Sequence, residues 1–243
     1  MPHFYVKPEN INNGVFSIEN EQAHYILTVR RFKKGDEIMI FDGLGNSYRG
    51  VISCADKNFI EGKILSSSYK MPSFTIKLYA AVPKGERFEW LIEKCAESGV
   101  SEIIPLKTAR SVNAFFSENK AGRFEKISVS ASSQCGRNDI MKISSPVDFQ
   151  TACENCFKNK NALNIIPWES EDTVSFFDLD YKNVQAANIF IGPEGGFENQ
   201  EVELAKSLGF ITVTLGENIL RTETAAVAAS ILVAAFQKLK SNA

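Results

Sequence analysis

The pattern of apolar and polar positions changes character near residue 70. Before that point, short apolar runs alternate with turn residues such as Asp42-Gly43-Leu44-Gly45-Asn46, which is typical of strands joined by tight turns. The expected strands cover residues 4–6, 37–41, 47–53 and 59–66, and residues 21–29 form the one expected helix. Several short strands of this kind predict a small β-barrel, and residues 70–73, a polar stretch with a proline, predict a domain boundary.

From residue 74 onward, apolar strands alternate with amphipathic helices. Strands are expected at 74–82, 102–106, 163–166, 189–191 and 211–215, and helices at 86–98, 120–135, 198–208 and about 223–240. In the first of these helices the apolar residues recur at the spacing of a single face, and Gly99 is expected to end it. The alternation predicts an α/β fold, a parallel sheet with helices on both sides.

Composition narrows the class of protein. The chain has 243 residues, of which 44% are hydrophobic and 23% charged, enough apolar material for one large domain or two small ones. No apolar run approaches the roughly 20 residues that cross a bilayer, and the N-terminus lacks the pattern of a signal peptide, so a cytoplasmic location is expected. The net charge of −2 leaves only local basic patches for contacts with nucleic acid.

Five cysteines are scattered along the chain, and Cys153 and Cys156 have C-x-x-C spacing. A zinc site would need two more soft ligands at matching spacing, but there is no second pair and the only histidines are His3 and His24. A redox motif would need an early βαβ context, which is missing. Reduced thiols on a helix, and no metal, are therefore expected.

Two glycine-containing loops carry the strongest chemical signal. Gly192-Pro193-Glu194-Gly195-Gly196-Phe197 follows an apolar run, and a second loop after residue 215 leads into Arg221-Thr222-Glu223-Thr224. Neither has the spacing of a dinucleotide-binding loop or the Gly-Lys-Ser/Thr ending of a P-loop. The G-x-S-x-G elbow is absent, and no histidine follows residue 24. Tight connections remain one interpretation, but two such loops before a charged helix start favour a ligand site.

The paired motifs, residues 191–197 and 215–226, strongly resemble the RsmE family of ribosomal RNA methyltransferases, of the knotted SPOUT class. Further matches are Lys84-Gly85-Glu86-Arg87, residues 93–100, Ile104-Pro105-Leu106 with Arg110-Ser111, Gln134-Cys135-Gly136-Arg137, residues 24–31 and Gly35-Asp36. The resemblance covers essentially the whole chain. Two positions depart from the family: His3 stands where a basic residue is common, and Ser133 where a glutamate is common.

This resemblance implies a PUA-like β-barrel that binds RNA, residues 1–71, and a SPOUT methyltransferase domain with a trefoil knot, residues 72–243. It also implies a homodimer with the site at the subunit interface, and S-adenosylmethionine as cofactor. The expected cofactor-binding residues lie in three loops of the knot region: Ile166, Pro167, Ile191, Gly192, Gly195, Gly196, Leu215, Gly216, Ile219, Leu220 and Thr224. Ala225, Ala226, Ala228 and Ala229 provide either close helix contact in the dimer or ordinary core.

The family methylates N3 of a uridine in 16S ribosomal RNA of the small subunit. That nitrogen carries a proton at neutral pH, so a base, or a cation that stabilises the ring anion, is needed. Arg221 is the expected contact to the anionic base or a phosphate, unless it forms only a salt bridge with Glu217 or Glu223. Glu223 is the expected general base, unless it serves only to favour the first helical turn. Glu194 is expected to hold its own loop.

Contacts with RNA are expected from basic residues of both domains. These are His24, Arg30, Arg31, Lys33, Lys34, Arg87, Arg110 and Arg137. Phe115 and Phe116 are candidates for stacking on an extruded base or for core packing. Two other hypotheses stay open: a non-catalytic RNA-binding or ribosome assembly factor, and a SPOUT methyltransferase with a different RNA target.

Overall fold

The computed structural model describes residues 3–111 and 118–240, which divide into two compact units. The first unit comprises residues 1–72 together with 129–140, and the second comprises residues 73–128 and 141–243. The first unit therefore includes a segment that is remote in sequence, the end of a helix and the turn after it. None of the described helices is long and apolar enough to cross a membrane.

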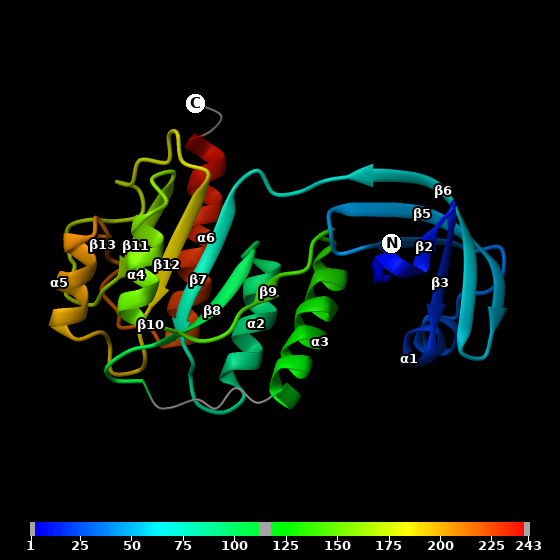
Figure 1. Cartoon of the computed structure of the whole chain (residues 1–243), viewed down its shortest axis with the longest axis horizontal. Coiled ribbons are helices and arrows are strands. Elements are labelled where there is room, and N and C mark those ends of the chain that lie inside the picture. Colours follow the sequence, from blue (N-terminus) through cyan, green and yellow to red (C-terminus); the bar gives the residue numbers. More distant parts are fainter. Residues whose placement is uncertain (1–2, 112–117, 241–243) are drawn as a thin grey trace. The chain divides into compact units, whose positions relative to one another are not determined.

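The first unit, most of which is blue to cyan in Figure 1, is built on a β-sheet. This sheet has six strands in the order β1-β4-β5-β6-β3-β2. Its strands are β1 (His3–Tyr5), β2 (Ile11–Asn12), β3 (Val15–Glu19), β4 (Glu37–Phe41), β5 (Asn46–Asp56) and β6 (Phe59–Tyr69). Strand β1 pairs with β4 in parallel, and the other neighbours are antiparallel. The side chain of Phe16 is fully buried and lies directly over Gly50 and Gly62, where any Cβ would collide with its ring.

Most of the expected elements of this unit are confirmed, with two differences. Strands β2 and β3 were not expected, although the burial of β3 alternates along the chain as a half-buried strand requires. The helix expected at 21–29 is an α-helix only in α1 (Asn20–His24) and continues as a π-helical turn, η2 (Tyr25–Val29). A short 3₁₀ turn, η1 (Pro8–Asn10), precedes β2.

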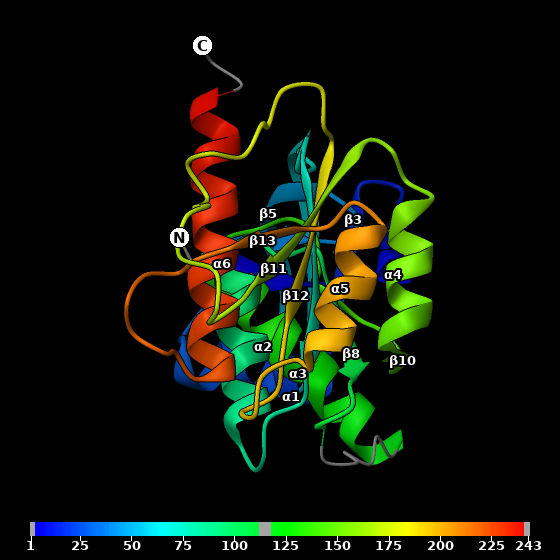
Figure 2. The ribbon, with the colours of Figure 1, turned by 90° about the vertical axis from the view of Figure 1, so that its left-hand side faces the viewer.

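The second unit is an α/β structure around a parallel seven-stranded sheet, as the alternating pattern predicted. Its strands are β7 (Thr75–Ala81), β8 (Glu102–Lys107), β9 (Lys142–Ile143), β10 (Val147–Asp148), β11 (Ala162–Pro167), β12 (Ala186–Ile191) and β13 (Ile211–Val213). The order is β10-β8-β7-β12-β11-β13, with β9 beside β8. Its helices are α2 (Arg87–Glu97), α4 (Phe149–Phe157), α5 (Asn199–Ser207) and α6 (Thr222–Lys240), and it also contains the first part of α3 (Glu118–Cys135), whose residues from 129 onward belong to the first unit. Helices α2 and α6 cover one face and α4 and α5 the other (Figure 2).

An aromatic cluster forms the core beneath α4 and α5. The ring of Phe190 on β12 stacks on Tyr79 at 4.4 Å and meets Phe210 edge-on at 4.9 Å. Cys153 and Cys156 are buried in the same cluster on α4. Burial raises the pKa of the Cys153 thiol to about 12, and it also raises the pKa of Cys156. Both cysteines are therefore neutral core thiols at physiological pH.

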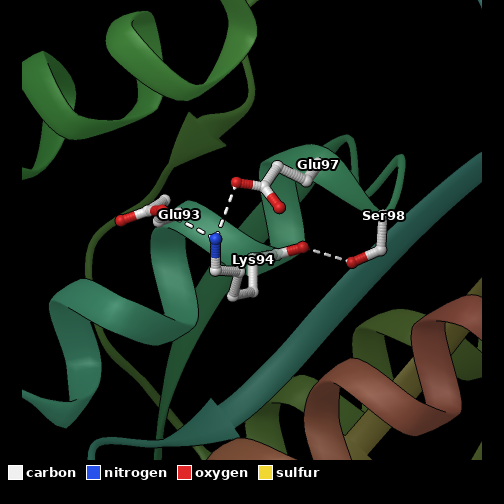
Figure 3. A network of polar contacts seen from close by, with 4 residues as sticks. All are labelled: Glu93, Lys94, Glu97 and Ser98. Atoms are coloured by element: carbon white, nitrogen blue, oxygen red, sulfur yellow. Dashed lines mark hydrogen bonds and ion pairs between the residues drawn. The ribbon is translucent and has the colours of Figure 1, made fainter. Parts of the chain in front are cut away.

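The exposed C-terminal end of α2 is held by a local polar network (Figure 3). The Lys94 ammonium donates to Glu93 at 2.7 Å and to Glu97 at 2.9 Å, while the Ser98 hydroxyl donates to the Lys94 carbonyl. Gly99 follows with a φ of 87°, a conformation that glycine adopts at little cost. The helix therefore ends where the sequence predicted.

Candidate functional site

A cleft opens at the carboxyl ends of β11 and β13, where α/β sheets commonly bind ligands. Three segments line it: the residues after β11, the loop after β13 and one position of α6. The lining residues are Pro167, Trp168, Glu169, Thr214, Leu215, Gly216, Glu217, Asn218, Ile219, Leu220 and Ala225. Two of the three predicted cofactor loops thus meet at one place.

The predicted cofactor-binding residues fall into three groups. Those that line the cleft are Pro167, Leu215, Gly216, Ile219 and Leu220. Ile166 and Ile191 are buried core residues near the ends of their strands and do not line the cleft. Gly192, Gly195 and Gly196 lie in the neighbouring loop after β12, and Thr224 is exposed in the first turn of α6.

The glycine-rich loop, residues 192–197, is folded tightly on itself and against the cleft. The Gly196 peptide N–H donates to the Pro193 carbonyl at 2.9 Å, and Gly196 has a φ of 69°. A Cβ at Gly196 would collide with the carboxylate of Glu169, which lines the cleft. The positive φ of the backbone therefore favours glycine here, and any larger residue would also have to displace the flexible Glu169 carboxylate.

Contacts from three other segments fasten this loop. The Thr222 hydroxyl at the start of α6 donates to the Gly192 carbonyl at 3.1 Å, and Arg110 donates to the Gly195 carbonyl at 2.7 Å. Arg110 also faces Glu198 at 3.6 Å. Glu201 in the first turn of α5 accepts from the Glu198 N–H at 2.9 Å and completes a capping box. The loop is thus ordered by the protein itself.

The loop after β13 is built differently. The Thr214 hydroxyl accepts from the Gly216 N–H at 3.1 Å, but the peptide N–H groups of residues 217–220 donate no hydrogen bond within the described part of the chain. The Ile219 side chain is 88% exposed. A loop that presents unpaired donors and an apolar side chain beside a cleft has the chemistry to hold a ligand with a flat apolar body and polar edges.

The segment after β11 is tied to β13. Trp168 N–H donates to the Val213 carbonyl at 3.0 Å, and Thr214 N–H donates to the Val174 carbonyl at 2.8 Å. The Glu171 carboxylate accepts hydrogen bonds from Thr212, Thr173 and the Val174 N–H. These bonds favour the ionised form and lower the pKa of Glu171 to about 2.

The first turn of α6 places two charged residues in contrasting environments. Arg221 is exposed and, among the described residues, has no ion-pair partner. Glu223 is 7% exposed, and its Oε2 accepts no hydrogen bond within the described chain. The cation nearest to that oxygen is Arg87, whose Nη1 lies 4.0 Å away. The alternative in which Arg221 pairs with Glu217 or Glu223 is therefore wrong in this structure.

The side chains predicted to contact RNA differ in their exposure and in whether they already bind other residues. In the first unit, His24, Arg30 and Arg31 are exposed, whereas Arg137 is largely buried and its Nε donates to Asp139 at 3.1 Å. In the second unit, Arg87 and Arg110 are engaged with the groups around the glycine-rich loop. Phe115 and Phe116 lie outside the described residues. No group of residues that could hold a metal ion occurs among the described side chains.

Three residues of the site were not foreseen from the sequence. Trp168 and Glu169 line the cleft, and the Thr222 hydroxyl holds the glycine-rich loop. The sequence could have indicated Thr222, because it is a threonine at a helix start between the two proposed site residues Arg221 and Glu223. Trp168 and Glu169 lie in the loop after Pro167, which the resemblance implied as a cofactor loop, but nothing local singled out these two residues or indicated that they approach residues 196 and 213.

The chain is similar to known proteins in both of its units. A family model described as the RNA methyltransferase domain matches residues 70–234, and a model of the RNA methyltransferase PUA domain matches residues 18–65. A "Ribosomal RNA small subunit methyltransferase E" of Buchnera aphidicola is 32% identical over 235 residues, which cover 94% of both proteins. The chain belongs to the RsmE family. The resemblance seen in the paired glycine motifs is thereby confirmed.

Solved RsmE-like structures extend the match to the whole fold. A probable rRNA-methyltransferase from Porphyromonas gingivalis superposes with a TM-score of 0.87 and 30% identity, covering 99% of this chain and 100% of the other. A ribosomal RNA small subunit methyltransferase E from Neisseria gonorrhoeae, crystallised with S-adenosyl methionine, gives a TM-score of 0.86 and 29% identity over 98% of each chain. The RsmE fold, with its PUA domain and parallel α/β domain, is thus present over essentially the full length.

Proposed function

We propose that this chain transfers a methyl group from S-adenosylmethionine to N3 of a uridine in 16S ribosomal RNA of the small subunit. Family membership, the names of the relatives and the cofactor in the Neisseria gonorrhoeae structure support the reaction class. The observation that carries the proposal is the cleft beside β11 and β13, with buried Glu223 and exposed Arg221 in the neighbouring first turn of α6.

The residues of the cleft fit the proposed cofactor. Leu215, Ile219 and Leu220 offer apolar surface for an adenine ring, and the unpaired N–H groups of residues 217–220 offer donors for its edge. Gly216, with a φ of 107° and no atoms near its missing Cβ, leaves open space. When bound, the cofactor supplies an electrophilic methyl group on a sulfonium sulfur, and the protein contributes orientation and electrostatics.

Glu223 and Arg221 are the proposed catalytic residues. The Glu223 Oε2 is buried and accepts no hydrogen bond, so it can take the proton of uridine N3 once bound RNA uncovers that oxygen. Arg221 is exposed and unpaired, and its fork of donors suits the oxygens of the deprotonated uracil or a nearby phosphate. The two residues are separated by one position and have different roles: Glu223 removes the proton, and Arg221 stabilises the negative charge.

The remaining assignments extend the same proposal. Residues 1–71 serve RNA binding, with His24, Arg30 and Arg31 as exposed contacts, and residues 72–243 form the knotted methyltransferase domain. The protein acts in the cytoplasm as a homodimer. In support of a dimer, Ile231 and Leu239 are exposed apolar residues of α6, whereas Ala226 and Ala229 are fully buried within the unit.

Labelled methyl transfer tests the proposal. The purified chain is incubated with methyl-labelled S-adenosylmethionine and with assembled small subunits, free rRNA or tRNA, and the product is mapped by mass spectrometry. One N3-methyluridine in small-subunit rRNA is expected. Binding of RNA without cofactor binding in calorimetry would identify an RNA-binding or assembly factor, and a labelled tRNA or 2′-hydroxyl would identify a different target.

A further inference from the structure

Arg87, the first residue of α2, joins two segments of the candidate site. Its Nη2 lies 3.2 Å from Glu194 in the glycine-rich loop, and its Nη1 lies 4.0 Å from Oε2 of Glu223 in the first turn of α6. Its Nε donates to the Lys84 carbonyl at 3.2 Å. Each nitrogen of the guanidinium is therefore directed at a group of the same unit.

The two carboxylates differ in their surroundings, and this difference decides what Arg87 does. The Glu194 side chain is 40% exposed, so its ion pair contributes little to stability but fixes the direction of the guanidinium. The Glu223 side chain is only 9% exposed, and a buried carboxylate without a nearby cation is costly. At 4.0 Å, Nη1 offsets that charge without donating a hydrogen bond, so Oε2 stays available as an acceptor.

Arg87 is also a second connection between the glycine-rich loop and α6. The first is the hydrogen bond from Thr222 to the Gly192 carbonyl. Arg87 spans the same two segments through Glu194, two positions after Gly192, and Glu223, the residue after Thr222. The loop and the first turn of α6 are therefore held together at two points.

Contact with an RNA phosphate is the other role open to this arginine. That role needs a free fork of donors, but Nε and Nη2 are already used by Lys84 and Glu194. We propose instead that Arg87 is a positioning residue for methyl transfer, which holds the glycine-rich loop and the Glu223 carboxylate in a fixed relation. This inference rests on the proposed function.

Variants of the full chain separate these roles. We expect Arg87→Gln to lower kcat for methyl transfer by roughly 10- to 100-fold, because misplaced reacting groups are costly. The KM for RNA should stay within about twofold and keep its dependence on salt, since no phosphate contact is lost. Arg87→Lys should recover only part of kcat, because an ammonium keeps the charge but not the fork. Arg123→Gln, which removes an exposed ion pair with Glu89, is the matched control and should leave kcat unchanged.

A second measurement does not depend on activity. Hydrogen exchange of the amides of residues 192–197 and of the first turn of α6 should accelerate in Arg87→Gln and not in Arg123→Gln. The double variant Arg87→Gln with Glu194→Gln should lose little more than Arg87→Gln alone, because the two residues act as one unit.

Two results would overturn the positioning role. One is unchanged exchange in Arg87→Gln, and the other is a raised RNA KM whose salt slope falls by about one phosphate contact while kcat is kept. If the wild-type chain transfers no methyl group, the proposed function fails by itself, and the exchange rates then decide separately whether Arg87 orders the loop.

Discussion

The two glycine-containing loops follow β12 and β13, the strands on either side of β11, yet they are held in opposite ways. Thr222, Arg110, Arg87 and the loop's own Pro193 carbonyl fasten residues 192–197. In the loop at 215–221, the peptide N–H groups of residues 217–220 and the Arg221 guanidinium have no partner in the described chain, and the Ile219 side chain is exposed. The loop at 192–197 is therefore ordered before any ligand binds, whereas the loop at 215–221 keeps unpaired groups that can bind a ligand. Their contrast predicts that substitutions in the first act through structure and in the second through binding and catalysis.

The largest expected effect belongs to the open loop. Arg221→Ala should reduce turnover by about 1,000-fold, to background, because it removes stabilisation of the charge that develops on the uracil. Calorimetry should show the affinity for S-adenosylmethionine within about twofold of wild type, since Arg221 makes no contact that orders the cleft. Unchanged turnover would refute the role of Arg221.

Loss of the proposed base is expected to cost less. Glu223→Gln keeps the shape of the side chain and should lower kcat by about 100-fold, within the usual range for general base catalysis. Circular dichroism and the melting temperature verify that the fold is kept. Glu203→Gln on the exposed side of α5 is the control, and an equal loss there would show that Glu223 has no special role.

A substitution at Gly196 tests whether the loop at 192–197 is ordered by the protein itself. Gly196→Ala should destabilise the protein by about 1–3 kcal/mol in urea unfolding, mainly because the backbone has positive φ and in part because the new methyl group displaces the Glu169 carboxylate. Cofactor affinity should fall with it. Gly209→Ala shares the positive φ, at 81°, but has open space around its missing Cβ, so it should be less destabilising and leave affinity intact. Equal effects of the two would remove the case for close approach.

A substitution at Ile219 tests whether the loop at 215–221 acts through ligand binding rather than through stability. An 88% exposed side chain contributes little to folding, so Ile219→Ser should change the free energy of unfolding by less than about 0.5 kcal/mol. The same change should weaken cofactor binding by roughly threefold to tenfold, because it removes apolar surface from the cleft. Calorimetry beside urea unfolding gives both numbers, and a stability loss without an affinity loss would reverse the interpretation.

The smallest effect is expected at Glu171, which orders the segment after β11. Hydrogen bonds lower its folded pKa to about 2 from an ordinary value near 4.5. Its contribution is therefore full above pH 4.5 and is lost as the pH falls toward 2. The melting temperature of Glu171→Gln should lie roughly 2–4 °C below wild type at pH 6, and the difference should shrink steadily below pH 4.5. A difference that persists unchanged at pH 2.5 would contradict the assignment.

Local patterns predicted the elements but not the contacts that build the site. The apolar periodicity of residues 86–98 and Gly99 located α2 almost completely, since a helix face is written in adjacent residues. The proximity of Glu169 to Gly196, or of Arg87 to Glu223, depends on strand order and on side-chain direction, which no local pattern encodes. The predictions for Arg87 and Arg110 as RNA contacts remain untested, although both side chains are engaged with the glycine-rich loop and its neighbours.

The most direct test of the central claim is mass mapping of the labelled product on small-subunit rRNA. Wild-type protein with S-adenosylmethionine should place one methyl group on N3 of a single uridine, and the Arg221→Ala protein, which keeps cofactor binding, should place none. A cofactor-bound wild-type protein that leaves the rRNA unmethylated, or that methylates another atom, would contradict the account.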